Sequence, residues 1–122
     1  RSFTTGSYNT EIGYQNPGGT GVTTGSSNTI IGARISGLDA ALSNTVVLAD
    51  GAGNKRMTID SSGHSRFEGI VQPKSYAVAG LPAAATAGAG AIAYVSNESG
   101  GAVLAFSDGS AWRRVTDRAV VS

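Results

Sequence analysis

The feature that most constrains this chain is a polar, glycine-rich block that occurs twice near its N-terminus. Residues 4–15 read TTGSYNTEIGYQ and residues 23–34 read TTGSSNTIIGAR, so that eight of twelve aligned positions are identical. Such a repeat is typical of architectures in which one small unit stacks on the next. The two blocks therefore predict two equivalent turns of the chain.

A third, degenerate copy, LSNTVVLADG, follows, in which Ser-Asn-Thr again precedes a β-branched pair. The copies are centred on Asn9, Asn28 and Asn44, with spacings of 19 and 16 residues, which are shorter than those of helical repeats. We interpret each copy as a turn, a short strand and a turn. Asn tolerates and Gly readily adopts the left-handed backbone region, so Gly6, Asn9, Gly13 and their counterparts are expected at the corners.

The composition indicates a chain that cannot stabilise itself as a monomer. Among 122 residues there are 18 glycines and no cysteine, so little apolar area can be buried and no disulfide can form. Ordering a residue costs about 1.5 kcal/mol, which places such a monomer near zero stability. A net charge of +1 and several β-branched runs do not fit a disordered chain. We therefore expect obligate assembly of several copies.

After the repeats, the pattern predicts short strands joined by tight turns. Residues 35–42 are interpreted as a short helix or a tight turn beginning near Asp39. Strand-like runs at 46–49, 55–59 and 65–68 alternate with Asp-Gly, Gly-Asn and Ser-Gly turns, which is hairpin chemistry. The Ala-Gly stretch 81–91 is interpreted as a loop leading into a strand. It sets the expected boundary between a stalk at 1–80 and a knob at 81–122.

Three runs in the knob, at 91–96, 102–107 and 111–115, are separated by glycine turns and predict an antiparallel β-meander. Strand alternation is expected to gather the larger apolar residues on one face that packs against a neighbouring copy. These residues are Ile92, Tyr94, Leu104, Phe106 and Trp112.

Charge and motifs weigh against several classes of function. The near-zero net charge does not favour nucleic acid or membrane surfaces, and no apolar run is long enough to span a membrane. No nucleophile elbow, P-loop or dinucleotide motif occurs, and the acidic residues are scattered. The loop from Asp50 to Arg56 lacks the ligands of a calcium loop, and His64 is expected to be solvated unless three copies meet on an axis. We expect no catalytic residue, cofactor or metal.

The block of residues 23–63, with Ser-x-Asn-Thr-Ile-Ile-Gly, Ser-Gly-Leu-Asp and Leu-Ala-Asp-Gly-x-Gly-Asn, resembles bacteriophage tail-fibre and tailspike proteins. The C-terminal stretch 81–115 is similar to the ends of many phage fibre and minor tail proteins. The Ile-Gly repeats also resemble the head repeats of trimeric autotransporter adhesins. The chain starts without Met and is therefore expected to be a fragment. It has no room after Trp112 for the self-cleaving chaperone domain that ends some fibres.

The resemblance implies an all-β fold, an intertwined homotrimeric stalk of β-prism or β-helix type with a small antiparallel β-meander tip. The axis of such a trimer would be lined by one set of apolar residues. These are Ile12, Ile30, Ile31, Val46, Val47 and Ile59.

The function implied is a structural virion fibre, located in the phage tail outside the cell. It would attach to a polysaccharide or protein of the bacterial surface through its C-terminal end. Other virion tail proteins would be further partners. The alternatives are a purely structural virion part without receptor binding and a fragment of a bacterial trimeric adhesin. Exposed aromatic and polar groups are the receptor candidates, although Tyr94, Phe106 and Trp112 are also candidates for a small core. The receptor candidates are Tyr94, Asn97, Glu98, Asp108, Trp112, Arg113 and Arg114.

Overall fold

The computed structural model describes residues 5–13 and 21–122, and residues 1–4 and 14–20 lie outside this description. The chain divides into two compact units, residues 1–71 and 72–122. The division precedes the expected boundary at 80/81 because β6 (Ser75–Tyr76) pairs in parallel with β7 (Ile92–Val95) of the second unit. Almost all regular structure is strand, which confirms the all-β class.

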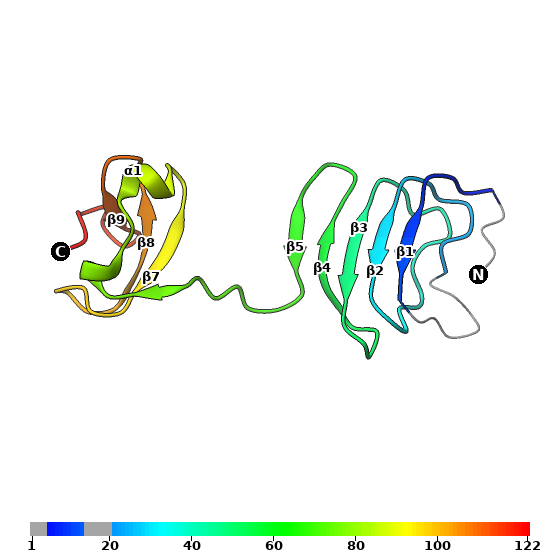
Figure 1. The fold of residues 1–122 in the computed structure, drawn as a ribbon, viewed down its shortest axis with the longest axis horizontal. Coiled ribbons are helices and arrows are strands. Elements are labelled where there is room, and N and C mark those ends of the chain that lie inside the picture. The colour runs from blue at the N-terminus through cyan, green and yellow to red at the C-terminus, as the bar shows by residue number, and fades with distance from the viewer. Residues whose placement is uncertain (1–4, 14–20) are drawn as a thin grey trace. The chain divides into compact units, whose positions relative to one another are not determined.

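The first unit contains a five-stranded sheet in the order β1-β2-β3-β4-β5 (Figure 1). The strands β1 (Thr10–Ile12), β2 (Thr29–Ile31) and β3 (Val46–Ala49) run parallel. The strands β4 (Lys55–Ile59) and β5 (Ser65–Phe67) continue the sheet as antiparallel hairpins. The three strand-like runs expected between residues 46 and 68 are thereby confirmed.

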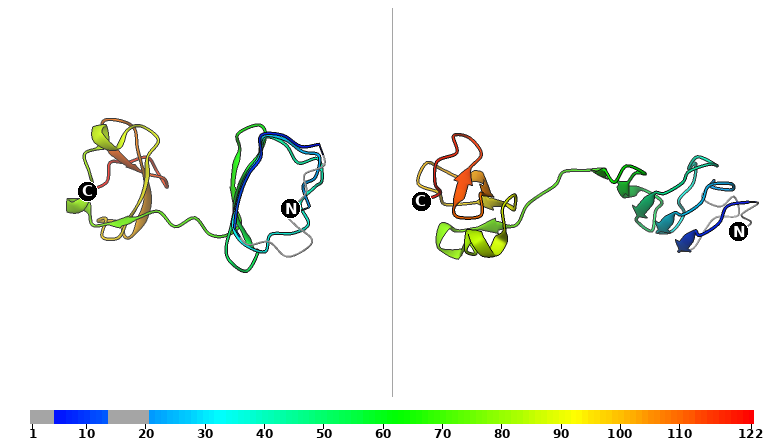
Figure 2. Two further views of the ribbon diagram at one scale, coloured as in Figure 1. Left: turned by 45° about the vertical axis from the view of Figure 1, so that its right-hand side comes forward. Right: turned by 90° about the horizontal axis from the view of Figure 1, so that it is seen from above.

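The three copies of the repeat lie on one another in register, and we call them the repeat stack. Thr10 pairs with Thr29 and Thr29 with Val46, so the structural spacings are 19 and 17 residues. The second spacing differs from the expected 16 because Thr45, and not Asn44, is the counterpart of Asn28. Away from the sheet each turn of the chain returns beside the next, and backbone bonds such as Thr23 N to Ala40 O at 3.0 Å join the returns (Figure 2).

The corners of the repeat stack agree only in part with the sequence-based expectation, which is confirmed at Gly13 (φ 133°) and Gly32 (φ 139°). Positive φ angles occur at Tyr8 (58°), Ser27 (62°) and Asn44 (54°), at matching places in the three copies. Asn9 and Asn28 are absent from the positive-φ residues, so the expectation that they form the corners was wrong. In each copy the residue just before Asn9, Asn28 or Thr45 takes the left-handed conformation instead, although this conformation is unfavourable for Tyr.

The interior of the repeat stack is closed by residues of the same chain. Val22, Ile30, Ile35 and Val47 are buried, and Leu38, Leu42 and Ala49 pack against them. Residues 35–42 form a tight turn and no helix: Ala41 N donates to Asp39 Oδ1 at 2.7 Å, and Leu42 N donates to Asp39 O at 3.1 Å. The turn brings the return segment across the inner face of the sheet.

The second unit is a four-stranded sheet in the order β6-β7-β8-β9, where β8 is Val103–Ser107 and β9 is Trp112–Arg114. The pairs β7–β8 and β8–β9 are antiparallel, which confirms the meander. Residues 78–91 contain a 3₁₀ turn, η1 (Val78–Gly80), and one helical turn, α1 (Ala84–Ala87). The expectation of a plain loop missed α1, which Gly88 ends with a φ of 85°.

The core of the second unit lies on the face of the sheet with the smaller residues. Ala84, Ala93, Val95, Ala105 and Trp112 are buried together. The expected face combining Trp112 with Ile92, Tyr94, Leu104 and Phe106 was wrong for Trp112. Trp112 pairs with Ser107, and Phe106, one residue earlier, points to the opposite face.

Candidate functional surfaces

A ladder of polar side chains runs through the repeat stack. Asn28 is buried, and its amide nitrogen donates to Asn9 Oδ1 at 2.9 Å and to Leu42 O at 2.6 Å. Its Oδ1 accepts from Thr45 N at 3.1 Å, as Asn9 Oδ1 accepts from Asn28 N at 3.0 Å. The same contact recurs between successive copies of the repeat. It gives the repeated Asn a structural role, because its side chain bonds backbone N–H groups that the strands leave without a partner.

The outer face of the five-stranded sheet carries an apolar row that crosses every strand. The register aligns one residue from each strand, and alternate positions of β3 and β4 add a second, shorter row. Ile12, Ile31 and Phe67 are 58%, 38% and 52% exposed. We call this surface the stack face. Its residues are Ile12, Ile31, Val46, Leu48, Met57, Ile59 and Phe67.

The residues expected on a trimer axis fall into two groups. Ile30 and Val47 are each 1% exposed and lie inside the repeat stack, where residues of the same chain cover them. Ile12, Ile31, Val46 and Ile59 lie on the stack face, where they are exposed or half-buried. The two groups separate because successive residues of a strand point to opposite faces.

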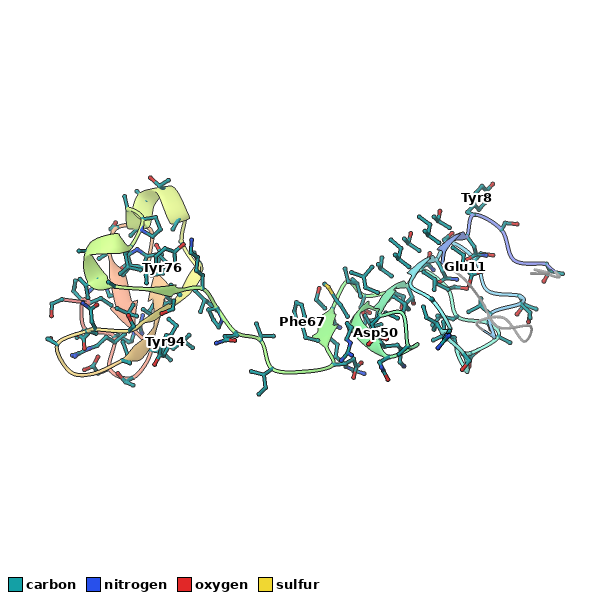
Figure 3. The ribbon with its side chains drawn as sticks, turned by 60° about the horizontal axis from the view of Figure 1, so that its bottom comes forward. Tyr8, Glu11, Asp50, Phe67, Tyr76 and Tyr94 are labelled. Atoms are coloured by element: carbon teal, nitrogen blue, oxygen red, sulfur yellow. The ribbon has the colours of Figure 1, made fainter. Side chains whose placement is uncertain are left out.

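Three residues of the stack face were not among the sequence candidates. Leu48, Met57 and Phe67 occupy the same row as Ile31, and Figure 3 labels Phe67 on the last strand of the sheet. Each lies in a correctly predicted strand, at a position whose side chain points to the same face of the sheet as Ile31. Extending the alternation from the repeats through 55–59 and 65–67 would have identified them.

Three of the receptor candidates are components of the second unit's own structure. Trp112 is buried, and its Nε1 donates to Pro82 O at 2.8 Å. Glu98 is 4% exposed, and its Oε2 accepts from Gly100 N at 2.7 Å. The guanidinium of Arg114 lies 3.3 Å from Glu98 Oε1 and 2.7 Å from Asp117 Oδ2.

The other receptor candidates lie at the surface. Asp108 Oδ1 accepts from Ser110 N and Ala111 N, and Arg113 Nε lies 2.6 Å from Asp108 Oδ2. These bonds lower the pKa of Asp108 to about 2, with the Ala111 N–H as the largest cause. The exposed Asn97 accepts from Val78 N at 2.8 Å through its Oδ1. Tyr94 is 40% exposed on the outer face of the sheet, and Figure 3 labels it.

Two further acidic turns of the first unit, at Asp50 and Asp60, also have structural bonds. Asp50 accepts from Ala52 N and Asn54 N and pairs with Arg56, and its pKa is lowered chiefly by the Asn54 side chain. Asp60 accepts from His64 N at 3.0 Å, and His64 Nδ1 lies 3.4 Å from Asp60 Oδ2.

Within residues 5–13 and 21–122, no group of three His, Cys, Asp or Glu side chains is placed to hold a metal ion. No helix in this part of the chain has the length and apolar character needed to cross a membrane. The chain matches no protein-family model, no curated protein and no solved structure at a significant level. The surfaces described above are therefore the basis for a functional proposal.

Proposed function

We propose that this chain is a structural component of a virion fibre, of the phage tail-fibre kind, and that it assembles as a homotrimer. The observation that carries the proposal is the stack face, an apolar row that crosses all five strands on the side opposite the core of the repeat stack and is exposed at Ile12, Ile31 and Phe67. Contiguous exposed apolar surface in a water-soluble chain marks a contact with another molecule. The resemblance of residues 23–63 to tail-fibre repeats makes other copies of the chain the partner.

The trimer would contain three repeat stacks packed through their stack faces, the β-prism or β-helix-like stalk of the resemblance. Ile30 and Val47 support each stack from inside, while Ile12, Ile31, Val46 and Ile59 contact the neighbouring copies. In this arrangement each stack closes its own core, and the copies meet through side chains.

Assembly is tested by light scattering over a range of concentrations. We expect a mass three times the 12.2 kDa of one chain. Ile31→Lys places a charge in the apolar row and is expected to dissociate the assembly, since burying an unpaired charge is costly. Ser36→Lys, at an exposed position on the return segment, is the matched control and should keep the trimer. A monomeric wild-type chain at every concentration would refute the proposal.

The second part of the proposal is attachment to a bacterial surface through the turns of the C-terminal unit. Asn97 and the Asp108–Arg113 pair present polar groups at its surface, with Arg113 and Asp108 side chains 34% and 32% exposed. Three weak contacts per fibre would act together, which raises the apparent affinity without any new contact. The partner would be a saccharide or protein of the cell surface.

Attachment is tested by adding the fluorescently labelled full chain to a panel of bacterial strains. We expect binding to at least one strain, and about a tenfold loss for Arg113→Gln because all copies of a trimer are affected at once. Arg34→Gln in the first unit removes a charge elsewhere and should bind normally. Loss of binding in both variants would contradict a contact specific to the C-terminal unit.

A second candidate is a purely structural virion part that contacts only other tail proteins. It is favoured by the bonds of Glu98, Trp112 and Arg114, which are used within the unit. A trimer that binds no strain of the panel would support this candidate over attachment. The adhesin alternative rests on the resemblance of the Ile-Gly repeats alone, and no contact described above favours it over a virion fibre.

A further inference from the structure

The outer face of the C-terminal sheet is more apolar in its large side chains than the core beneath it. Ile92, Leu104 and Val115 are 59%, 38% and 52% exposed, and Tyr94 is 40% exposed. The core on the opposite face contains three alanines, Val95 and Trp112. We call this surface the knob face. Its residues are Ile92, Tyr94, Leu104, Phe106 and Val115.

The residues of the knob face form one continuous surface across three strands. Ile92 pairs with Phe106, and Tyr94 pairs with Leu104. Val115 N donates to Leu104 O at 2.9 Å, which places Val115 beside Leu104 at the end of β9. Residues paired across strands point to the same side of the sheet, so these side chains are neighbours.

The knob face has one charged side chain, and that charge is already paired within the unit, so the face does not attract a charged partner. Arg113 shares this face as the pairing residue of Phe106, and its guanidinium is bonded to Asp108. The surface is therefore apolar with one internally compensated charge. Such a surface can be buried against another copy of itself without leaving an unpaired charge, and it gives no electrostatic attraction to nucleic acid or an anionic membrane.

The area of the face indicates that it does not act alone. Strands lie about 4.8 Å apart and residues rise about 3.4 Å along them, so each unit's outer face covers on the order of 300 Å². A specific interface buries about 800 Å² on each partner. Neither face reaches this area by itself, so each is treated as a separate contact, and Ile70 and Val71, which are 98% and 61% exposed, are further apolar residues in the segment between the two units.

We infer that the knob face is a second contact between copies of this chain, and that assembly requires the stack face and the knob face together. A second copy is the partner because copies that meet through their stack faces also bring their knob faces together, since each chain carries both surfaces. Once one pair of faces has met, the second pair meets at a high effective concentration. The inference rests on the proposed assembly of copies. It makes Tyr94 a contact between copies, while Arg113, whose guanidinium is bonded to Asp108 in the turn after β8, stays outside that contact as a receptor candidate.

The test compares variants of the full chain by light scattering and sedimentation over a concentration series. We expect Leu104→Lys, like Ile31→Lys, to raise the concentration needed for assembly by about tenfold or more. Thr86→Lys, which adds the same charge at an exposed position of α1, is expected to assemble like the wild type. Emission from Trp112, the only tryptophan, reports whether the C-terminal unit is folded.

If Leu104→Lys alters the Trp112 emission, Ile92→Lys at the more exposed position decides the question. The inference is overturned if the folded knob-face variant assembles like the wild type while Ile31→Lys does not, and the proposed function then stands. It is also overturned if Thr86→Lys disperses the assembly equally. A wild-type chain that stays monomeric refutes the inference and the proposed assembly together.

Discussion

Gly25 shows how a missing side chain determines the distance between two turns of the chain. A Cβ at this position would lie 1.8 Å from the carbonyl oxygen of Leu42 in the next copy. The same place in the third copy is occupied by Leu42, which is followed by no further copy of the repeat. The φ of Gly25 is not positive, so its backbone conformation does not require glycine. Glycine is required here by the close approach of the next copy of the repeat in the same chain.

We predict that Gly25→Ala lowers the free energy of unfolding by about 3 kcal/mol, because the methyl group must displace backbone of the neighbouring copy. Gly51→Ala is the matched control, since no atom lies within 4 Å of its Cβ and its φ is not positive. Urea unfolding followed by circular dichroism measures both. Equal stabilities of the two variants would contradict the close approach.

Glu98 is one of the carboxylates through which we expect pH to change the stability of the C-terminal unit. Its pKa is lowered chiefly by the Gly100 N–H, with the charge of Arg114 assisting and burial opposing. Because the folded pKa lies below the unfolded value, the carboxylate stabilises the unit above the unfolded pKa, and this stabilisation is lost as the pH falls through the folded pKa. Asp108 and Asp117, whose pKa values are also lowered, act in the same direction.

We predict that Glu98→Gln makes the stability of the C-terminal unit less dependent on pH below about pH 5. The unfolding midpoint followed by Trp112 emission should fall on acidification in the wild type and fall less in the variant. Glu68→Gln, an exposed carboxylate of the first unit, is the control. A wild-type midpoint that is constant from pH 7 to pH 3 would refute the role of these carboxylates.

At the scale of elements, the repeat stack depends on the side-chain ladder as well as on its strands. Asn28 joins the first copy to the third through Asn9 Oδ1, Leu42 O and Thr45 N. Thr45 is the counterpart of Asn28 in the third copy, and it ends the ladder by donating its backbone N–H to Asn28 Oδ1. Its hydroxyl turns back to Ser43 O at 3.0 Å.

We predict that Asn28→Ala destabilises the first unit by about 3 kcal/mol or more, since each buried group left without a partner costs about 1–3 kcal/mol. Asn44→Gly is the control, because Asn44 lies at a corner with a φ of 54° that glycine adopts freely. Chemical unfolding is the measurement. The ladder would have no role in stability if the Asn28 variant unfolded at the same denaturant concentration as the control.

The antiparallel hairpins were predictable from the sequence because turn chemistry is local. The turn after β3 is formed by Asp50, whose carboxylate accepts the N–H groups of Ala52 and Asn54. In the turn after β4, the carboxylate of Asp60 accepts in the same way from Ser62 N and His64 N. Asp and Gly at these spacings favour a turn through local hydrogen bonds and backbone conformation, without any long-range contact. The one-turn helix α1, by contrast, was missed because no side-chain cap or amphipathic pattern marks it.

At the scale of the whole molecule, two compact units are joined by an exposed segment. Residues 69–72 are exposed, and Ile70 has a relative exposure of 98%. An extended apolar linker of this kind is open to proteases unless another molecule covers it. Its accessibility therefore reports on assembly as well as on domain organisation.

We predict that thermolysin, which cleaves before large apolar residues, first cuts the unassembled chain before Ile70 or Val71. Mass spectrometry should find residues 1–69 with 70–122, or residues 1–70 with 71–122, before any cut within a sheet. The double variant Ile70→Gly, Val71→Gly is the control and should be cut more slowly. First cleavage within β7 or β8 would contradict the division into two units, and a slower cut in the assembled form would support coverage of the linker.

The sequence alone determined the all-β class, the repeat, five of the strands outside it and the polar turns, because these follow from alternation, Gly and Asn chemistry, and self-similarity. Asn28 shows the limit of that information: the motif was visible, but its inward ladder appears only when three copies lie in register. Trp112 shows another limit, since its pairing with Ser107 depends on register across β8 and β9.

Which side of each sheet becomes the core was decided by tertiary structure. In the first unit the return segments cover the face with Ile30 and Val47, and the stack face stays open. In the second unit α1 and Trp112 cover the face with the alanines, which leaves the larger residues of the knob face outside. Alternation states only that two faces exist, and long-range contacts select the one that is buried. For this reason most residues of these surfaces could be named from the sequence, whereas only the folded chain shows that they lie on the open face of each sheet.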